Sequence, residues 1–320
     1  MITLPGPLGS ALASTAPSTT STGFSLSPGG LLLPYHAGVL ASLSYNGQLP
    51  SSAHLAGSSA GSIAVTAHAT GVKATDALEG TIRVSDHVAA MGGARGNLLP
   101  PLRTEMETLI GPNGHEIINE REGVVGLAHR ELFPNNRPVL RTKFDTKQDL
   151  IEAVCDSSMF PFFATNWPVR LRKGNSKRRV ALPRVVVDGF FSVPRERYGC
   201  PDFEQIEDRA EKPKIDRVVT VCVFPHDTVG FTASEKRDQI SPAPLEDSTG
   251  QMTELFRLAT QSSSREELTN LYEQGWADAE RWFVNEERYE RERIAEERRL
   301  KRMINEERGL FGNFAGRGWN

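Results

Sequence analysis

The pattern of apolar and polar positions is clearest at the start of the chain, where the first charged side chain is Lys73. Residues 24–72 can therefore be buried on most sides without placing a charge inside the protein. Their apolar runs, broken by Gly and Ser, predict short strands alternating with apolar helices. The expected elements are a strand at residues 23–26, a helix at 33–44, a strand at 53–55 and a helix at 60–69.

Further along the chain, β-branched and aromatic runs predict more strands. The expected strands are Val139–Phe144, Val185–Val187 and Val218–Phe224, with a helix at Lys147–Cys155 between the first two. Strands that alternate with helices favour an α/β fold built on an open sheet. Residues 85–125 carry little signal for either kind of element.

The C-terminal part of the chain differs in composition from the rest. Residues 280–308 contain nine acidic and nine basic side chains, and Glu287 with Arg291 and Glu297 with Lys301 lie four residues apart. This spacing supports an exposed helix. Because the few apolar residues form only a thin stripe, we expect a solvated helical tail rather than a partner-binding or membrane-lying helix.

The composition of the whole chain fits one catalytic domain with an appendage. It has 320 residues, of which 38% are hydrophobic, and a formal net charge of -3 with a pI near 6.2. This balance argues against a nucleic-acid-binding protein, which normally has a basic excess. Cys155, Cys200 and Cys222 lie far apart without metal-type spacing and cannot complete a disulfide framework. We expect no metal and no cofactor.

The N-terminal segment has a composition of its own. Residues 1–23 are rich in Ser, Thr, Ala and Pro, which predicts a disordered leader or, as an alternative, a transit segment. The longest apolar stretch, residues 31–43, contains Pro34 and His36 and is too short to cross a bilayer. With the unpaired cysteines, these features predict an intracellular protein, in the cytoplasm or in a plastid.

A nucleophile motif lies between the second strand and the second helix. Gly57-Ser58-Ser59-Ala60-Gly61 fits the pattern G-x-S-x-G, in which flanking glycines permit a strained turn that presents the serine at the start of a helix. The amides and the positive dipole end of that helix would favour an alkoxide at Ser59. The alternative is a glycine-serine turn that opens an ordinary buried helix.

Two other turns contain candidate chemistry. Ser27-Pro28-Gly29-Gly30 separates the first strand from the first helix, and its backbone amides could bind an oxyanion. Asp188 follows the strand Val185–Val187, at a strand end where ligand sites of open α/β sheets tend to lie, and Gly189 allows an immediate turn. An Asp in a turn is also a common local hydrogen-bond acceptor.

Taken together, these segments resemble the patatin-like phospholipases. The resemblance rests on residues 24–38, which read FSLSPGGLLLPYHAG, on residues 57–61, on Val187-Asp188-Gly189, on residues 140–163 and on residues 272–282. Tyr35-His36 makes the first segment most similar to the acylglycerol lipases related to adipose triglyceride lipase. The resemblance implies a patatin-like three-layer open sheet with helices on both faces, followed by the charged C-terminal helix.

The resemblance and the change in composition divide the chain into four segments. After the leader at 1–23, we expect a patatin-like catalytic domain at 24–232, a C-terminal extension of that domain at 233–283 and a charged helical tail at 284–320. The likeness covers about residues 24–283.

The resemblance also implies a Ser-Asp dyad that cleaves carboxylic esters of lipids, either triacylglycerols or phospholipids. Ser59 would be the nucleophile, Asp188 would be the general base without an intervening histidine, and the amides of Gly29 and Gly30 would form the oxyanion hole. The implied partner is a lipid ester at a membrane or droplet surface, which the protein would contact peripherally.

Three positions depart from the family pattern. Leu33 stands where a further glycine is usual, Phe190 replaces the second glycine after Asp188, and Pro28 has no amide hydrogen to donate. Activity could therefore be reduced or redirected.

Two other functions stay open at this point. Ser59, Asp188 and His226 occur in the chain order of an α/β-hydrolase triad, in which His226 would be the base. A patatin-like domain with an altered glycine turn could also be a non-catalytic scaffold on a lipid surface. His36, on an apolar helix, is expected to be a hydrogen-bonded core histidine.

A lipid substrate requires apolar surface around the site, because the enzyme must meet a droplet or a bilayer. The candidate segments are Met159–Phe163 and Phe190-Phe191. Within them, Phe162 and Phe163 are expected to belong to the core.

Overall fold

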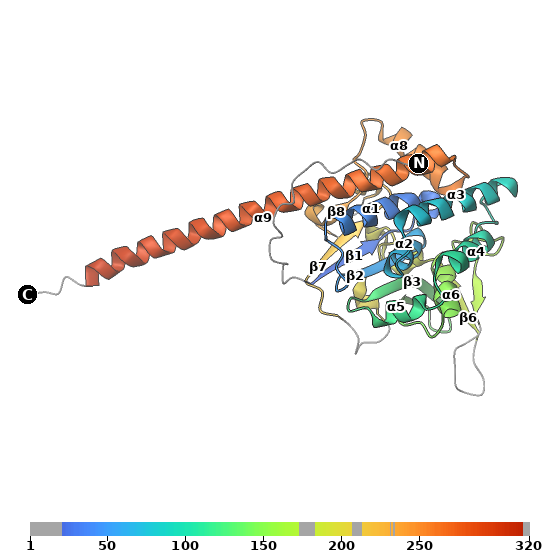
Figure 1. Cartoon of the computed structure of the whole chain (residues 1–320), viewed down its shortest axis with the longest axis horizontal. Helices are drawn as coiled ribbons and strands as arrows, with labels where there is room; N and C mark the ends of the chain where they lie inside the picture. The colour runs from blue at the N-terminus through green and yellow to red at the C-terminus, as the bar shows by residue number, and fades with distance from the viewer. Residues whose placement is uncertain (1–20, 173–182, 207–212, 231, 233, 316–320) are drawn as a thin grey trace, which may run out of the picture.

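The computed structural model describes residues 21–172, 183–206, 213–230, 232 and 234–315, with side chains as far as residue 304. A sheet runs through the body of the molecule, helices lie against it, and a long helix extends away from the body toward the C-terminus (Figure 1). Of the expected leader, residues 1–20 lie outside the described residues.

Within the described residues, eight strands form one mixed sheet in the order β5-β6-β3-β2-β1-β7-β8, with β4 paired to β3 outside this order. The strands are β1 (Thr22–Leu26), β2 (His54–Ser58), β3 (Val125–Phe133), β4 (Arg137–Arg141), β5 (Arg170–Arg172), β6 (Arg184–Val187), β7 (Arg217–Val221) and β8 (Gln239–Ile240). From β3 to β8 along the order the neighbours are parallel, whereas β4, β5 and β6 pair antiparallel.

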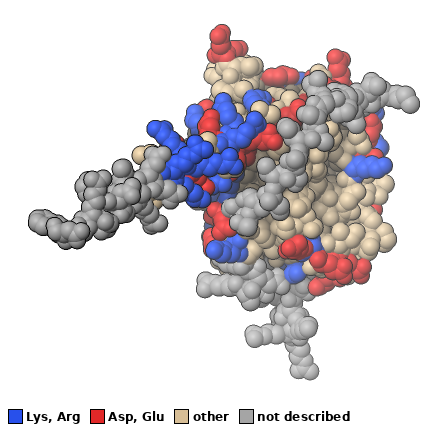
Figure 2. Space-filling model, turned by 60° about the vertical axis from the view of Figure 1, so that its left-hand side comes forward, with Lys and Arg blue, Asp and Glu red and all other residues tan. Residues whose placement is uncertain are grey.

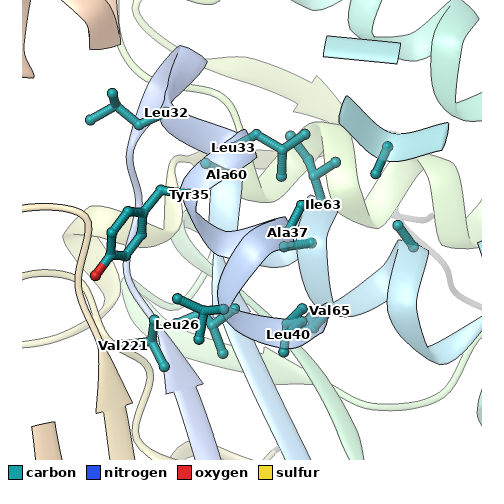
Figure 3. Close-up of a cluster of buried hydrophobic side chains, with 14 of the residues drawn as sticks. Leu26, Leu32, Leu33, Tyr35, Ala37, Leu40, Ala60, Ile63, Val65 and Val221 are labelled. Atoms are coloured by element: carbon teal, nitrogen blue, oxygen red, sulfur yellow. The ribbon is translucent and has the colours of Figure 1, made fainter. Parts of the chain in front are cut away.

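The α-helices pack against one face of the sheet. They are α1 (Leu33–Tyr45), α2 (Ala60–Ala69), α3 (Ala74–Ala90), α4 (Leu99–Leu109), α5 (Gly114–Glu120), α6 (Lys147–Ser157), α7 (His226–Val229), α8 (Ser248–Thr260) and α9 (Arg265–Ala315). Successive strand residues point to opposite faces, so Leu26 and Leu55 face the helices. Figure 3 shows Leu26 of β1 beside Leu40 of α1 and Val65 of α2. Burying each such side chain contributes about 1.5–3 kcal/mol.

Short 3-10 helices and extended chain cover the other face, among them η2 (Gly189–Ser192), η3 (Arg195–Arg197) and η4 (Phe203–Gln205). Two further 3-10 helices lie elsewhere: η1 (Gly30–Leu32) leads into α1 on the α-helix side, and η6 (Lys236–Asp238) leads into β8. Here Ala56 and Ala128 of the sheet pack with Phe203 and Ile206. The result is a mixed sheet flanked by helices, which confirms the predicted fold class.

Most of the expected N-terminal elements are present within one to three residues of their expected ends. β1, α1, β2 and α2 follow the predicted order, and α6 extends to Ser157. The strand expected at 139–144 ends earlier, at Arg141, because Thr146 then caps α6 by accepting from the Asp149 amide. The strand expected at 218–224 ends at Val221, and the Val223 amide donates to Ser27 Oγ at 3.2 Å instead.

Sequence patterns did not reveal α3, α4, α5 or β3. The second half of β3 reads His129-Arg130-Glu131 and lacks the apolar alternation of a strand. Glu131 is nevertheless buried, because Arg184 of β6 and Arg137 of β4 both pair with its carboxylate. A long-range ion pair of this kind cannot be inferred from a local pattern.

The register of β3 brings the ends of β2 and β6 together. β4 pairs with residues 127–131 of β3, so β2 and β6 both lie on the opposite side of β3. β2 is parallel to β3 and ends with Ser58 opposite Ala128, whereas β6 is antiparallel and ends with Val187 opposite Arg130. The two strands therefore run toward each other, and their carboxyl ends meet.

The first part of α9 packs closely against α1. A Cβ atom on Gly38 would lie 2.0 Å from the Tyr272 carbonyl oxygen, and one on Gly275 would lie 2.1 Å from the Tyr35 carbonyl oxygen. The Tyr35 hydroxyl also donates to Asp278 Oδ2 at 2.8 Å. Glycine at both crossing points allows the two backbones to approach.

Candidate active site

Ser59 occupies the strained turn between β2 and α2. Its φ of 49° and ψ of -118° lie outside the regions that side chains ordinarily adopt. A Cβ atom on Gly57 would lie 2.3 Å from the Gly61 carbonyl carbon, and one on Gly61 would lie 2.6 Å from the Leu26 carbonyl oxygen. Both motif glycines are therefore required by close packing, and the turn has the geometry of a nucleophile elbow.

The backbone of Ser59 is held from two sides. Its amide donates to Ser157 Oγ at 2.9 Å, and its carbonyl accepts from Ser62 Oγ at 2.7 Å. Ser157 is completely buried at the end of α6. Because the Ser59 conformation is strained, these bonds help to fix the direction of its hydroxyl.

Asp188 lies at the end of β6 and is completely buried. Its backbone amide donates to the Met159 carbonyl at 2.9 Å, and its Oδ1 accepts from the Phe190 amide at 2.8 Å. Oδ2 is buried and has no hydrogen-bond partner of good geometry among the described residues. The Ser59 hydroxyl nevertheless lies near enough to affect the carboxyl group.

The electrostatic state of Asp188 follows from these contacts. Burial raises the pKa of its carboxyl to about 7, and the interactions with the Phe190 amide and the Ser59 hydroxyl limit the rise. A carboxylate with a pKa near neutrality and a free oxygen beside a serine hydroxyl can accept the proton of that hydroxyl. Phe190, a departure from the family pattern, keeps the amide that orients Asp188.

The glycine turn lies beside the elbow, since the backbone of Ser27 contacts Gly61. Within the described part of the chain, no carbonyl accepts from the amides of Gly29 or Gly30. Gly30 has a φ of +57°, and a Cβ atom there would lie 2.3 Å from the Ala259 carbonyl oxygen of α8. His36 Nε2 bonds to the Ser27 carbonyl at 2.8 Å, as expected for a core histidine, and burial lowers its pKa to about 4.

A family model described as patatin-like phospholipase matches residues 24–195, which is 172 of the 320 residues and includes the elbow, the glycine turn and Asp188. The chain belongs to this family. Patatin-like phospholipases hydrolyse lipid esters, so membership indicates a hydrolase of the lipase or phospholipase kind.

Comparison with solved structures gives two similar bacterial proteins. VipD from Legionella pneumophila is 13% identical with a TM-score of 0.45, over 84% of this chain and 67% of VipD. ExoU, in its complex with SpcU from Pseudomonas aeruginosa, is 15% identical with a TM-score of 0.42, over 83% of this chain and 51% of that one. This chain thus spans about half of the ExoU chain. No curated protein matches the sequence.

In this patatin-like chain, His226 does not complete a triad. It begins α7 and is buried, and burial lowers the pKa of its imidazole to about 4. The side-chain interactions of Asp188 within the described residues involve the Phe190 amide and the Ser59 hydroxyl, and no histidine. The structure therefore brings Ser59 and Asp188 together without His226.

Aromatic rings form a row of neighbouring rings beside Asp188. The ring centroids are 5.5 Å apart between Phe160 and Phe191, 5.2 Å between Phe191 and Phe190, 5.8 Å between Phe190 and Tyr198, 5.5 Å between Tyr198 and Phe224, and 5.1 Å between Phe224 and Phe256. Phe160, Phe191 and Phe256 are exposed, whereas Phe224 is buried in the core. We call these six rings the aromatic surface.

Phe162, in the loop next to the aromatic surface, does not lie where the sequence predicted. Phe162 was expected in the core, but its side chain is 54% exposed and its φ is 59°. The Phe162 amide donates to the carbonyl of Trp167, which is also exposed. Phe163 is half-buried and packs against the core. The left-handed backbone at Phe162 turns its ring outward.

Sequence reasoning missed Ser157 and the Met159 carbonyl, which hold Ser59 and Asp188 respectively. The sequence feature that could have indicated Ser157 is the polar pair Ser157-Ser158 at the end of an otherwise apolar helix face. A buried hydroxyl in such a place needs a hydrogen-bond partner. Among the described residues there is no group of His, Cys, Asp and Glu that could hold a metal ion. None of the described helices has the length and apolar character needed to cross a membrane.

Proposed function

We propose that this protein hydrolyses carboxylic esters of acylglycerols or phospholipids through a Ser59–Asp188 dyad. The observation that carries the proposal is the buried, singly bonded carboxyl of Asp188 beside the strained Ser59. The Tyr35-His36 pair of α1, where the chain resembles the acylglycerol lipases, favours acylglycerols as substrates.

The acylation step begins when Asp188 Oδ2 takes the proton of the Ser59 hydroxyl. Ser59 Oγ then forms a bond to the ester carbonyl carbon, and the carbonyl oxygen becomes an oxyanion. The unaccepted amides of Gly29 and Gly30 donate to that oxyanion. When the intermediate collapses, the ester bond breaks, the alcohol leaves with the proton from Asp188, and the acyl group remains on Ser59.

Deacylation repeats the same steps with water. Asp188 takes a proton from the water, the water oxygen attacks the acyl carbon, and the bond to Ser59 Oγ breaks as Asp188 returns the proton to it. The products are a fatty acid and the free hydroxyl of Ser59. Both half-reactions use the same carboxylate, so no histidine is required.

The aromatic surface supports a lipid rather than a small polar ester. Phe190 lies two residues from Asp188, and the row ends at the exposed Phe160 on one side and at the exposed Phe256 of α8 on the other. Acyl chains can lie against the exposed rings. Leu33, another departure from the family pattern, is buried in the core at the start of α1 and leaves this surface unchanged.

Hydrolysis of a soluble nitrophenyl ester and of an emulsified triacylglycerol, measured side by side, tests the proposal. Ser59→Ala and Asp188→Asn should each lower kcat/KM by roughly 10⁴-fold or more. His226→Ala is the control and should stay close to wild type. Loss of activity in that control, with activity kept in Asp188→Asn, would refute the dyad.

Labelling with an active-site phosphonate distinguishes the hydrolase from a scaffold. The phosphonate should react with Ser59 and not with the Ser59→Ala protein, because the oxyanion hole stabilises the attacked phosphorus centre as well. If the wild-type protein hydrolyses neither ester and resists the label, a non-catalytic lipid-binding role replaces the proposal.

A further inference from the structure

The free part of α9 carries a short segment that combines basic and apolar side chains. We define the basic-apolar turn as residues 298–304, which consist of Arg298, Arg299, Leu300, Lys301, Arg302, Met303 and Ile304. The segment has four basic residues and no acidic one. Leu300, Met303 and Ile304 are each 49% exposed, so the body of the protein does not cover them.

The two kinds of side chain lie on opposite sides of the helix. Leu300, Met303 and Ile304 are spaced by three and four residues and therefore share one face. Arg298 and Arg302, four residues apart, lie on the face opposite to them at 100° per residue. The turn therefore has one apolar side and one basic side.

The basic residues of the turn differ from those just before it in their pairing. Arg291 pairs with Glu287 at 3.2 Å, and Arg293 pairs with Glu290 and Glu297. Glu297 thus pairs with Arg293, not with Lys301 as its spacing predicted.

Among the side chains that the structure describes, only one carboxylate lies near a basic residue of the turn. Glu296 lies 4.0 Å from Arg299, and no described carboxylate pairs with Arg298, Lys301 or Arg302. Among the described side chains, these three positive charges therefore have no carboxylate partner.

The turn also lies far from the body. The last described contacts of α9 with the body join Arg237 to Glu286, Tyr289 and Glu290. At 1.5 Å per residue, about 21 Å of helix separates Glu290 from Ile304. Figure 1 shows this part of α9 projecting alone, and Figure 2 shows Lys and Arg side chains gathered along it.

We infer that the basic-apolar turn binds the surface of an anionic lipid bilayer. Its guanidinium and ammonium groups would bind phosphate and carboxylate head groups, while the apolar side enters the boundary of the acyl chains. Neither property alone indicates a membrane. A basic side that no described carboxylate pairs with, opposite an exposed apolar side, fits a charged bilayer surface, where phosphate head groups lie above acyl chains.

A second copy of the helix fits the turn less well. A coiled coil needs apolar residues repeated every seven positions over several heptads. One heptad before Leu300, Met303 and Ile304, the chain has Arg293, Glu296 and Glu297. One heptad after them it has Glu307, Leu310 and Phe311, so the apolar repeat covers at most two heptads, fewer than the several that a coiled coil needs.

Vesicle sedimentation of the full chain tests this inference. Every protein carries Ser59→Ala, so that the lipids stay intact and the result does not depend on the proposed hydrolysis. Vesicles of phosphatidylcholine are compared with vesicles that contain about one third phosphatidylserine, at low and at high salt. We expect binding to the anionic vesicles only, and weaker binding at high salt.

Matched variants locate the binding to the turn. Arg298→Gln/Arg299→Gln/Arg302→Gln should weaken binding by about tenfold or more, since each basic side chain near an anionic surface contributes to binding. Leu300→Gln/Met303→Gln/Ile304→Gln should also weaken it, and glutamine keeps the helix propensity. The control Lys73→Gln/Arg95→Gln/Arg195→Gln removes three exposed charges from the body and should bind like the parent.

Three results would overturn the inference. They are equal binding to both kinds of vesicle, no binding to either, and turn variants that bind like the parent protein. Sedimentation equilibrium without lipid measures whether the chain forms a dimer. A dimer that Leu300→Gln/Met303→Gln/Ile304→Gln dissociates would assign the turn to a second copy of the chain instead.

Discussion

Asp188 combines complete burial with one fixed and one free oxygen, and this combination predicts the pH dependence of the reaction. The carboxyl acts as a base only when ionised, and burial raises its pKa to about 7. The value of kcat/KM for a neutral soluble ester should therefore rise with pH through about 7 and then level. A flat profile between pH 5 and pH 8 would contradict the assignment of Asp188 as the base.

Stability provides an independent check on the same group. Because the pKa of Asp188 is higher in the folded state than in the unfolded chain, its contribution to stability is fully present below about pH 4 and is lost as the pH rises to about 7. Asp188→Asn keeps a neutral side chain throughout. The Tm of the Asp188→Asn protein minus that of the wild-type protein should therefore increase as the pH rises from 4 to 8.

At the scale of elements, the end of α6 aligns the two catalytic segments. Ser157 accepts from the Ser59 amide, and Met159 accepts from the Asp188 amide. Ser157→Ala leaves the Ser59 amide unpaired in a buried site and should lower kcat about tenfold with KM nearly unchanged. Ser158→Ala is the matched control, since the buried Ser158 hydroxyl has no partner among the described residues. Equal effects of both changes would mean that general packing, not alignment of Ser59, is responsible.

The elements also explain how much the sequence could predict. β1, α1, β2 and α2 are apolar and contiguous, so local patterns sufficed for them and for the elbow at Ser59. Asp188 was expected at a ligand site because it follows a strand of an open α/β sheet. Its place beside Ser59 comes from the register, in which antiparallel β6 meets β2 end to end along β3. Ser157 acts across 98 residues of sequence, which no local pattern reports.

At the scale of the whole molecule, the first part of α9 packs against the body and the rest of the helix is exposed to solvent. The expected limit between the extension at 233–283 and the tail at 284–320 falls inside this continuous helix. Just before that limit Trp282 packs edge-on against Phe24 of β1, and just beyond it Glu286 accepts from both Arg217 and Arg237. Burial opposes ionisation of Glu286, but the bonds from the two arginines hold its pKa at about 2. Since Glu290 also lies 3.5 Å from Arg237, we propose that the body extends to Glu290.

Paired substitutions of glutamate can locate the point at which α9 leaves the body. Glu286→Gln removes a carboxylate shared by two arginines and should lower the free energy of unfolding by about 1–3 kcal/mol in urea titrations. Glu297→Gln removes an exposed pair with Arg293 in the same helix and should cost less than about 0.5 kcal/mol. The difference should persist at neutral pH, because Glu286 loses its charge only as the pH falls toward 2. Equal costs would mean that α9 unfolds as one unit along its whole length. A lipid surface that binds its free end would then also affect the packing of α9 against α1, beside the catalytic sheet.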